Sequence, residues 1–159
     1  MPQHVSTCLR FTGKAKDAAE VYVSLFPNSR VLEVTYFPEG APVPAGTVLT
    51  VRLTLDGTEY LFLNGGPQYT LSPAASLLAQ CATQAEVDRL WDALCDGGTP
   101  VQCGWLTDRF GVSWQVVPTA MFDLLFSKTD KAAAQRAFLA MMQMIRLDLP
   151  AIQRAYDGA

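Results

Sequence analysis

The fold is decided by residues 77–96, LLAQCATQAEVDRLWDALCD, which read as one strand followed by one amphipathic helix. Thr83 and Glu86 have the spacing of a capping box, in which each side chain bonds the other residue's backbone N–H at the start of a helix. The apolar residues that follow recur on one helical face: Val87, Leu90, Trp91 and Leu94. Gly97 and Gly98 then end the helix. We therefore predict a strand over 77–82 and a helix over 84–96.

The same order of elements extends on both sides of this stretch. Three further strands are predicted after the helix, over 101–103, 105–107 and 112–117, with residues 108–111 as a turn. The first half of the chain has a strand over 5–11, a helix over 14–26 that Pro27 ends, and strands over 31–37, 48–55 and 59–63. Asp56 and Gly57 predict a two-residue hairpin between the last two strands. Each half therefore reads strand, helix, strand, strand, strand, with very little residue identity between the halves.

The remaining residues form connections and a helical C-terminus. Residues 38–46 read as an exposed loop, and residues 64–74 as a bridge between the halves. After Pro118 the pattern is helical only, and Asp148 can cap a last helix that carries Ile152, Ala155 and Tyr156. The helix before it has an apolar stripe formed by Ala134, Phe138, Met141, Met142 and Ile145. This stripe could pack against the sheet or a second subunit, or it could form an adaptable ligand-binding surface. The 159 residues predict one domain with module one at about 1–66, module two at about 74–118 and a helical extension at about 119–159.

Composition excludes several classes of partner. The chain has 12 basic and 15 acidic residues, so it lacks the basic stripe that nucleic acid or an anionic membrane surface requires. No apolar run reaches the length that spans a bilayer, and no signal peptide begins the chain. We therefore expect a cytoplasmic protein. Its cysteines, at 8, 81, 95 and 103, are then expected to be buried thiols and not disulfides.

The residue inventory also limits the chemistry. The single histidine, His4, lies near the N-terminus, so one chain cannot supply a Ser-His-Asp or Cys-His arrangement or a multi-histidine metal site. No Gly-x-Gly-x-x-Gly follows a strand, which leaves the nucleotide-binding folds without support. These absences remove most hydrolase mechanisms and the usual methyltransferase fold.

Five residues in three segments are candidates for a site. Asn64 ends a strand before Gly65-Gly66, so it fits either a turn or a ligand-facing role. Gln102, Cys103 and Trp105 surround Gly104, which fits a pocket lining or a bulged strand with Trp105 in the core. No evident neighbour in the sequence would activate the Cys103 thiol, so a nucleophilic role is not expected. Arg52 lies on the polar side of its strand and fits an anion-binding role or a solvated charge.

Several motifs together resemble the PhnB-like branch of the vicinal oxygen chelate superfamily, which includes glyoxalase I, bleomycin-resistance proteins and extradiol dioxygenases. The motifs are residues 11–13, Tyr22, 25–29, 63–67, 102–106 and 108–118. The resemblance implies an α+β fold in which two βαβββ modules form a curled mixed sheet around a cleft. In this family the cleft is usually completed in a homodimer, and the present chain adds C-terminal helices. Members of this branch often carry a demethylubiquinone methyltransferase label. We treat that label as a name, because no cofactor-binding glycine loop is visible.

The resemblance also locates candidate ligand positions. Metal-using members of the superfamily place His, Gln or Glu at four points, which fall here near Thr7, Asn64 (or Phe62), Ser76 and Gln115. Only Gln115 is a residue type that the superfamily uses, so no cofactor is expected, although a weakly held divalent metal stays open.

Two main functions follow from this assignment. The dimer binds an aromatic or amphipathic small molecule between Trp105, Phe62, Tyr60 and their partners, or it is a metal-dependent lyase, isomerase or dioxygenase in which Gln115 and Asn64 stabilise an oxyanion. The enzyme would lack a general base. A third possibility is an interaction scaffold that uses the C-terminal helices.

Overall fold

A computed structural model describes residues 5–159 of the chain, in two compact units. The first unit ends at Leu71 and the second runs from Ser72 to Ala159, so the boundary falls in the bridge expected over 64–74. His4 lies outside the described residues. Within those residues, no helix has both the length and the apolar character that a membrane crossing requires.

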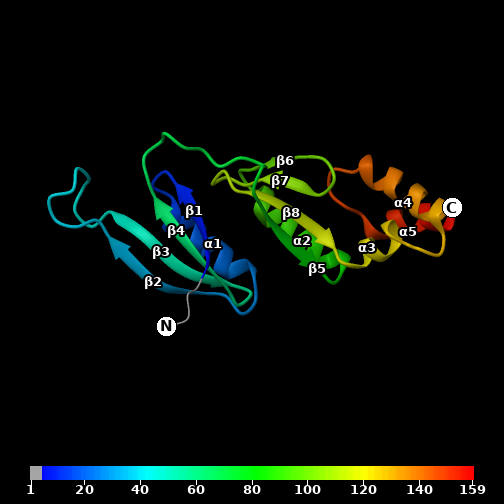
Figure 1. Cartoon of the computed structure of the whole chain (residues 1–159), viewed down its shortest axis with the longest axis horizontal. Coiled ribbons are helices and arrows are strands. Elements are labelled where there is room, and N and C mark those ends of the chain that lie inside the picture. The colour runs from blue at the N-terminus through cyan, green and yellow to red at the C-terminus, as the bar shows by residue number, and fades with distance from the viewer. Residues whose placement is uncertain (1–4) are drawn as a thin grey trace. The chain divides into compact units, whose positions relative to one another are not determined.

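The first unit is a four-stranded sheet with one helix (Figure 1). Its elements are β1 (Thr7–Phe11), α1 (Ala15–Leu25), β2 (Arg30–Tyr36), β3 (Val48–Leu55) and β4 (Thr58–Asn64). The strand order is β1-β4-β3-β2, with β1 parallel to β4 and the other pairs antiparallel. Asp56 and Gly57 both have positive φ, at 47° and 78°, as the predicted two-residue hairpin requires.

The second unit repeats this topology and adds three helices. Its sheet is formed by β5 (Ser76–Cys81), β6 (Thr99–Pro100), β7 (Trp105–Thr107) and β8 (Ser113–Pro118), in the order β5-β8-β7-β6, with α2 (Gln84–Cys95) against one face. The helices α3 (Ala120–Leu125), α4 (Lys131–Met142) and α5 (Leu149–Asp157) follow. The predicted α+β architecture, with two βαβββ modules and C-terminal helices, is confirmed, and each module forms a four-stranded mixed sheet of its own.

The predicted capping box starts α2. The Glu86 backbone N–H donates to Thr83 Oγ1 at 3.2 Å, and the Thr83 backbone N–H donates to a Glu86 carboxylate oxygen at 3.3 Å. The strand expected over 101–103 is wrong, because β6 ends at Pro100. Cys103 and Gly104 have φ values of 60° and 80°, which turn the chain out of an extended conformation before β7.

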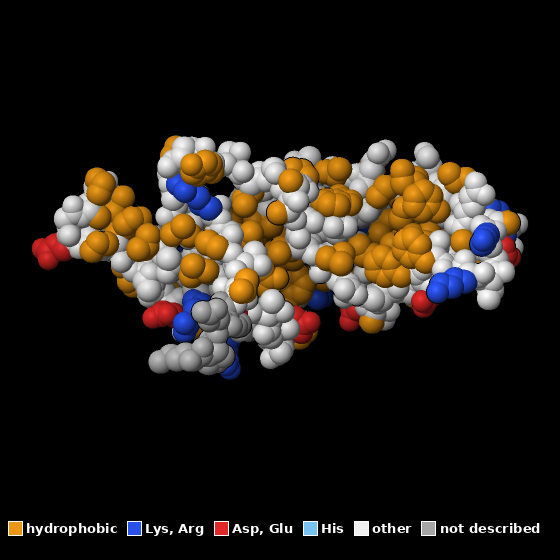
Figure 2. All heavy atoms as spheres, in the orientation of Figure 1, with side chains coloured by type: hydrophobic (Ala, Val, Ile, Leu, Met, Phe, Trp, Pro, Cys, Tyr) orange, Lys and Arg blue, Asp and Glu red, His pale blue; other side chains and the backbone are white. Residues whose placement is uncertain are grey.

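The C-terminal helices pack around a small core of their own. It consists of Val117, Met121, Leu125, Ala137, Leu147 and Ile152. The stripe predicted on α4 is only partly right: Ala134 is buried and Met141 packs against this core, whereas Phe138, Met142 and Ile145 are exposed. The buried face of α4 is formed instead by Ala133, Ala134 and Ala137, because alanines let the helices approach closely. Figure 2 shows hydrophobic side chains at the surface of this helical part of the second unit.

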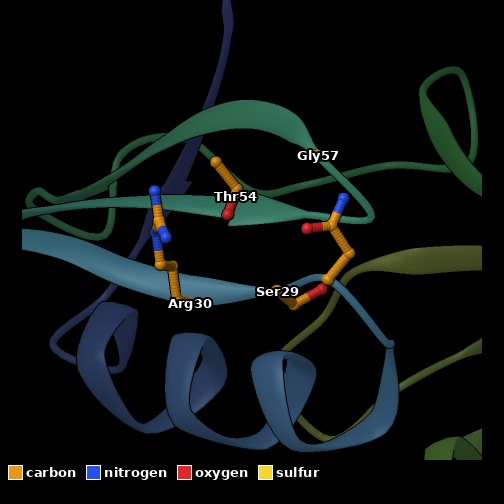
Figure 3. A pocket seen from close by; sticks show the side chains of 5 residues that line it. Ser29, Arg30, Thr54 and Gly57 are labelled. Carbon is orange, nitrogen blue, oxygen red and sulfur yellow. The ribbon is translucent and has the colours of Figure 1, made fainter.

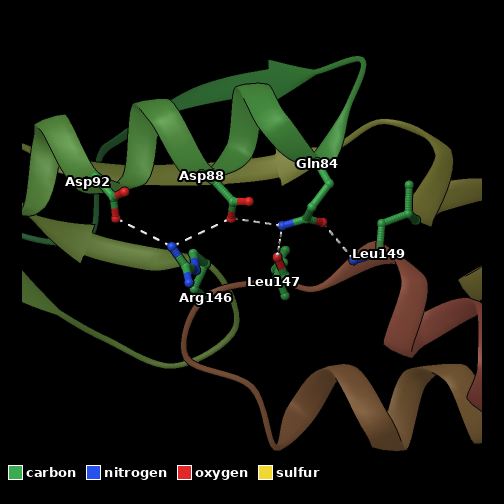
Figure 4. Close-up of polar contacts among 6 residues, drawn as sticks. All are labelled: Gln84, Asp88, Asp92, Arg146, Leu147 and Leu149. Carbon is green, nitrogen blue, oxygen red and sulfur yellow. Dashed lines mark hydrogen bonds and ion pairs between the residues drawn. The ribbon is translucent and has the colours of Figure 1, made fainter.

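A polar cluster ties the segment before α5 to α2 (Figure 4). The Gln84 side chain donates to the Leu147 carbonyl at 2.9 Å and accepts from the Leu149 N–H at 2.8 Å. Arg146 lies 3.5 Å from Asp88 and 3.3 Å from Asp92. The helical extension is therefore held against module two by specific contacts as well as by its apolar core.

All four cysteines are free thiols, as expected, but only Cys81 is buried; Cys8 is exposed, and Cys95 and Cys103 are partly exposed. Cys8 alternates with the buried Leu9 along β1, so its side chain lies on the side of the strand away from α1. The expectation that Cys8 is buried is therefore wrong. Burial, together with the nearby Glu86, raises the pKa of Cys81 to about 11. The Cys81 thiol is therefore protonated at neutral pH and is a poor nucleophile.

Candidate functional site

Each sheet has one face under its helix and one face that the helix leaves open, and strand register assigns every residue to one of them. In β3 the residues buried under α1 are Val51, Leu53 and Leu55, whereas Thr50, Arg52 and Thr54 lie on the other side. We call these the helix-covered face and the open face. Side chains that are in register across neighbouring strands share a face.

Register places the candidate residues of β1 and β4 on the helix-covered face. Thr7 is in register with Tyr60, and Tyr60 with Leu53. Phe62 follows Tyr60 at the period of two and is fully buried, with its ring centroid 4.9 Å from that of Phe11 and 5.8 Å from that of Tyr22. Partial burial raises the pKa of the Tyr60 hydroxyl. Phe62 is therefore a core residue and not part of a ligand-facing surface.

Asn64 has neither of the two roles that the sequence left open. It is buried, its Oδ1 accepts the Ala15 N–H at 2.9 Å, and its Nδ2 donates to the Val48 carbonyl at 3.0 Å. Lys14, the residue before α1, makes no side-chain cap. Asn64 thus caps the first turn of α1 from a distant strand and ties that helix to the sheet. Because Lys14 is a poor N-cap residue, the sequence indicates that the first turn of α1 needs a hydrogen-bond acceptor from elsewhere in the chain.

The open face of the first unit is charged. Arg52 is half exposed and lies 3.7 Å from Glu33 and 3.9 Å from Glu59, so its charge is already paired. Arg10 was missed by the sequence analysis, although it alternates with Leu9 and Phe11 along β1. Its guanidinium donates to the Gly66 carbonyl at 3.4 Å and lies 4.9 Å from the centre of the Tyr69 ring. Both arginines thus contact groups of their own unit.

The second unit brings three candidate residues together on its open face. Trp105 on β7 is in register with Gln115 on β8, which is in register with Leu78 on β5. The Gln115 side-chain amide donates to Ser76 Oγ at 2.9 Å. Leu78 is 47% exposed, and Trp105, Gln115 and Ser76 are partly exposed. An indole, an aliphatic side chain and an oriented amide therefore form one accessible surface.

A buried hydroxyl lies beside this surface. Ser113 is in register with Ser76 and is two residues from Gln115, so it shares their face. It is only 3% exposed, and its Oγ has no hydrogen-bond partner within residues 5–159. Buried polar atoms are almost always paired, so an orphan hydroxyl next to Gln115 indicates a position that a water molecule or a polar ligand atom satisfies.

The other two candidates of this segment lie in the turn that leads to Trp105. The Trp105 backbone N–H donates to the Gln102 carbonyl at 3.2 Å, and the Cys103 backbone N–H donates to the Met144 carbonyl at 2.7 Å. The Cys103 sulfur is 3.8 Å from the Met142 sulfur. Gln102 and Cys103 therefore connect the Trp105 strand to the segment that follows α4.

Asp108 is a buried carboxylate that the sequence analysis read only as part of a turn. One of its oxygens accepts the N–H groups of Phe110 and Val112 at 2.8 and 3.0 Å, and the other accepts Trp114 Nε1–H at 2.8 Å. These bonds fix the connection between β7 and β8. Asp108 is therefore a structural residue that sets the spacing of Trp105 and Gln115.

The residues at the four superfamily metal positions do not fit a divalent-metal site. Thr7 shares the helix-covered face with Asn64, whose side-chain oxygen is already bonded to α1, while Ser76 and Gln115 bond each other. The side chains of threonine, serine and asparagine are also poor ligands for such a metal. Within residues 5–159, no three His, Cys, Asp or Glu side chains cluster in a way that could hold one.

Comparison with known proteins gives one family and several related structures. A model of the 3-demethylubiquinone-9 3-methyltransferase family matches residues 3–117, which is most of the chain and excludes the C-terminal helices. No curated protein matches the sequence. The PhnB protein of Bacillus cereus is 32% identical, with 74% of this chain and 100% of that chain covered and a TM-score of 0.69.

A second solved structure shows the same fold at lower identity. Protein PA1353 of Pseudomonas aeruginosa is 23% identical, with 71% of this chain and 95% of that chain covered and a TM-score of 0.58. The match to the family model and the identity to the Bacillus protein agree with the motifs of the sequence and with the repeated topology of the two sheets. The chain belongs to the PhnB-like, 3-demethylubiquinone-9 3-methyltransferase family.

Proposed function

We propose that this protein binds a small, uncharged aromatic molecule on the open face of its second sheet, without metal chemistry. The observation that carries the proposal is the surface formed by Trp105, Leu78 and the Gln115–Ser76 hydrogen bond, next to the orphan Ser113 hydroxyl. The indole and the leucine provide an apolar platform, and the amide provides an oriented polar group. This combination is typical of small-molecule sites.

The charge of the surface sets the ligand class. Every residue that register places on this face is uncharged: Ser76, Leu78, Gln80, Thr99, Trp105, Thr107, Ser113, Gln115 and Val117. An ionised ligand would lose hydration there without gaining an opposite charge. A neutral aromatic molecule with one hydrogen-bonding group would stack on Trp105 and bond Gln115.

Homodimerisation, which the family resemblance implies, and a cytoplasmic location, which we expect from the sequence, are part of the same proposal. Light scattering on the purified protein is expected to give twice the chain mass of 17.3 kDa. A monomer mass at binding concentrations would remove the dimer from the proposal and leave the site within one chain.

Benzamide is a suitable probe, because it has a neutral ring and one amide group. We expect saturable quenching of tryptophan fluorescence, since Trp91 and Trp114 are buried and Trp105 is the accessible indole. Gln115→Leu is expected to weaken binding about three- to tenfold through the lost hydrogen bond. Gln80→Ala, which removes an exposed amide from the same face, is the matched control and should leave the affinity unchanged.

Benzoate separates this proposal from non-specific aromatic binding. It has the same ring with a negative charge, and we expect it to bind at least tenfold more weakly than benzamide. Equal affinities for the two probes, or equal effects of Gln115→Leu and Gln80→Ala, would contradict the proposal.

A further inference from the structure

A pocket in the first unit is lined only by residues of that unit. It has a volume of about 370 Å³ and is lined by Asn28, Ser29, Arg30, Thr54 and Gly57. Arg30 and Thr54 are in register across β2 and β3, so both side chains extend from the open face of that sheet. Figure 3 shows these two side chains with Ser29 and Gly57 around one shared space.

The backbone around this pocket is held by hydrogen bonds. The Gly57 N–H donates to the Asn28 carbonyl at 3.1 Å, and the Asp56 N–H donates to Ser29 Oγ at 2.9 Å. Ser29 Oγ also donates to the Pro27 carbonyl at 3.0 Å. These bonds fix the 27–30 loop to the β3–β4 hairpin, so the lining residues keep their spacing without a ligand.

Three polar side chains of the lining remain without a partner. Asn28, Arg30 and Thr54 make no side-chain hydrogen bond or ion pair with any residue of the described range 5–159. Arg52, which lies two residues before Thr54 on the same face, differs because Glu33 and Glu59 both pair with it. Glu33 and Glu59, the latter in register with Thr54, therefore pair with Arg52, and Arg30 has no ion-pair partner among residues 5–159.

The donor set fits a tetrahedral oxyanion. A guanidinium presents paired N–H groups at the spacing of two phosphate oxygens, and the Asn28 amide and Thr54 hydroxyl add further donors. None of the five lining residues is acidic. The pocket is also larger than an inorganic phosphate ion requires, which leaves space for an organic group. We propose that Asn28, Arg30 and Thr54 bind the phosphate group of a small phosphorylated molecule, independently of the aromatic site.

The test is a titration of the ¹⁵N-labelled protein at constant ionic strength, followed by amide chemical shifts. The probes are glycerol 3-phosphate, inorganic phosphate and glycerol. We expect saturable shifts at residues 28–30, 54 and 57 with glycerol 3-phosphate, weaker binding of inorganic phosphate and no shifts with glycerol. Equal affinity for both phosphates would support the same site with free phosphate as its occupant. The absence of shifts there with either phosphate would overturn the proposal.

Matched variants separate a specific site from general charge attraction. Arg30→Gln removes an exposed, unpaired charge, so the fold is expected to persist and the affinity for glycerol 3-phosphate to fall at least tenfold. Arg52→Gln removes the same charge from the same face and is expected to change the affinity less than twofold. Equal losses in the two variants would show that only net charge matters and would reject the site. Unchanged shifts for the rest of the protein confirm that each variant is folded.

Discussion

The two sheets share one topology and differ in what their open faces carry. Both place the first strand beside the fourth and the second strand at the far edge, and both bury apolar side chains under a single helix. The open face of the first sheet carries Arg10, Arg30 and Arg52 with Glu33 and Glu59, whereas that of the second carries no charge. The helix-covered faces thus carry the apolar core of each unit, whereas the open faces differ in charge.

The largest expected effect separates the helix-covered face from the open face. Phe62→Ala is expected to lower the free energy of unfolding by about 3–5 kcal/mol, because it leaves a cavity between Phe11 and Tyr22. Leu61→Ala on the open face of the same strand should cost clearly less. Urea denaturation measures both, and similar losses would contradict the assignment of Phe62 to the core.

A smaller effect is expected from the buried carboxylate of the second unit. Asp108→Ala removes the acceptor of three hydrogen bonds and should lower the free energy of unfolding by about 2–4 kcal/mol. Asp96→Ala, which breaks the exposed pair with Arg109, is the control and should cost under about 1 kcal/mol. Equal losses by urea denaturation would show that the Asp108 turn is not essential.

The two helices of the repeated modules are capped differently. Asn64 caps α1 from a distant strand, whereas α2 is capped locally by Thr83. We expect Asn64→Ala to cost about 1–3 kcal/mol, because it also leaves the Val48 carbonyl without its Asn64 donor, and Thr83→Ala to cost about 1 kcal/mol. Thermal unfolding of the two variants gives the comparison. A larger loss for Thr83→Ala would reverse our interpretation of Asn64 as a long-range tie.

The smallest expected effect concerns divalent metals. Added nickel, zinc, manganese or iron(II) should leave the melting temperature of the wild type within about 1 °C of its value in EDTA, because residues 5–159 offer no favourable ligand set that would stabilise the native state. A saturable rise with one metal that disappears in Gln115→Ala would restore the metal-dependent alternative at the second sheet.

The sequence predicted most of the fold because its strongest signals are local. The Thr83–Glu86 box, the Asp56–Gly57 hairpin and the apolar alternation of β3 each act within a few residues. The strand expected over 101–103 is wrong because the backbone is left-handed at Cys103 and Gly104. The hydrophobicity pattern of the sequence does not indicate this backbone conformation.

The candidate site was predictable only in part, because it depends on which side of a strand each residue faces. Counting from the helices gave Thr7, Phe62 and Asn64 for the first module, and the register turns all three towards α1. A shift of one residue along a strand exchanges its two faces. In the second module the same counting found Ser76 and Gln115, which do share the open face with Trp105.

The most direct test of the central claim is an amide chemical-shift map of benzamide binding to the ¹⁵N-labelled wild-type protein. Our account predicts saturable shifts along β5, β7 and β8, centred on residues 76–78, 105–107 and 113–115, with β1–β4 unaffected. Shifts confined to the first unit, or no shifts at benzamide concentrations that quench tryptophan fluorescence, would contradict it.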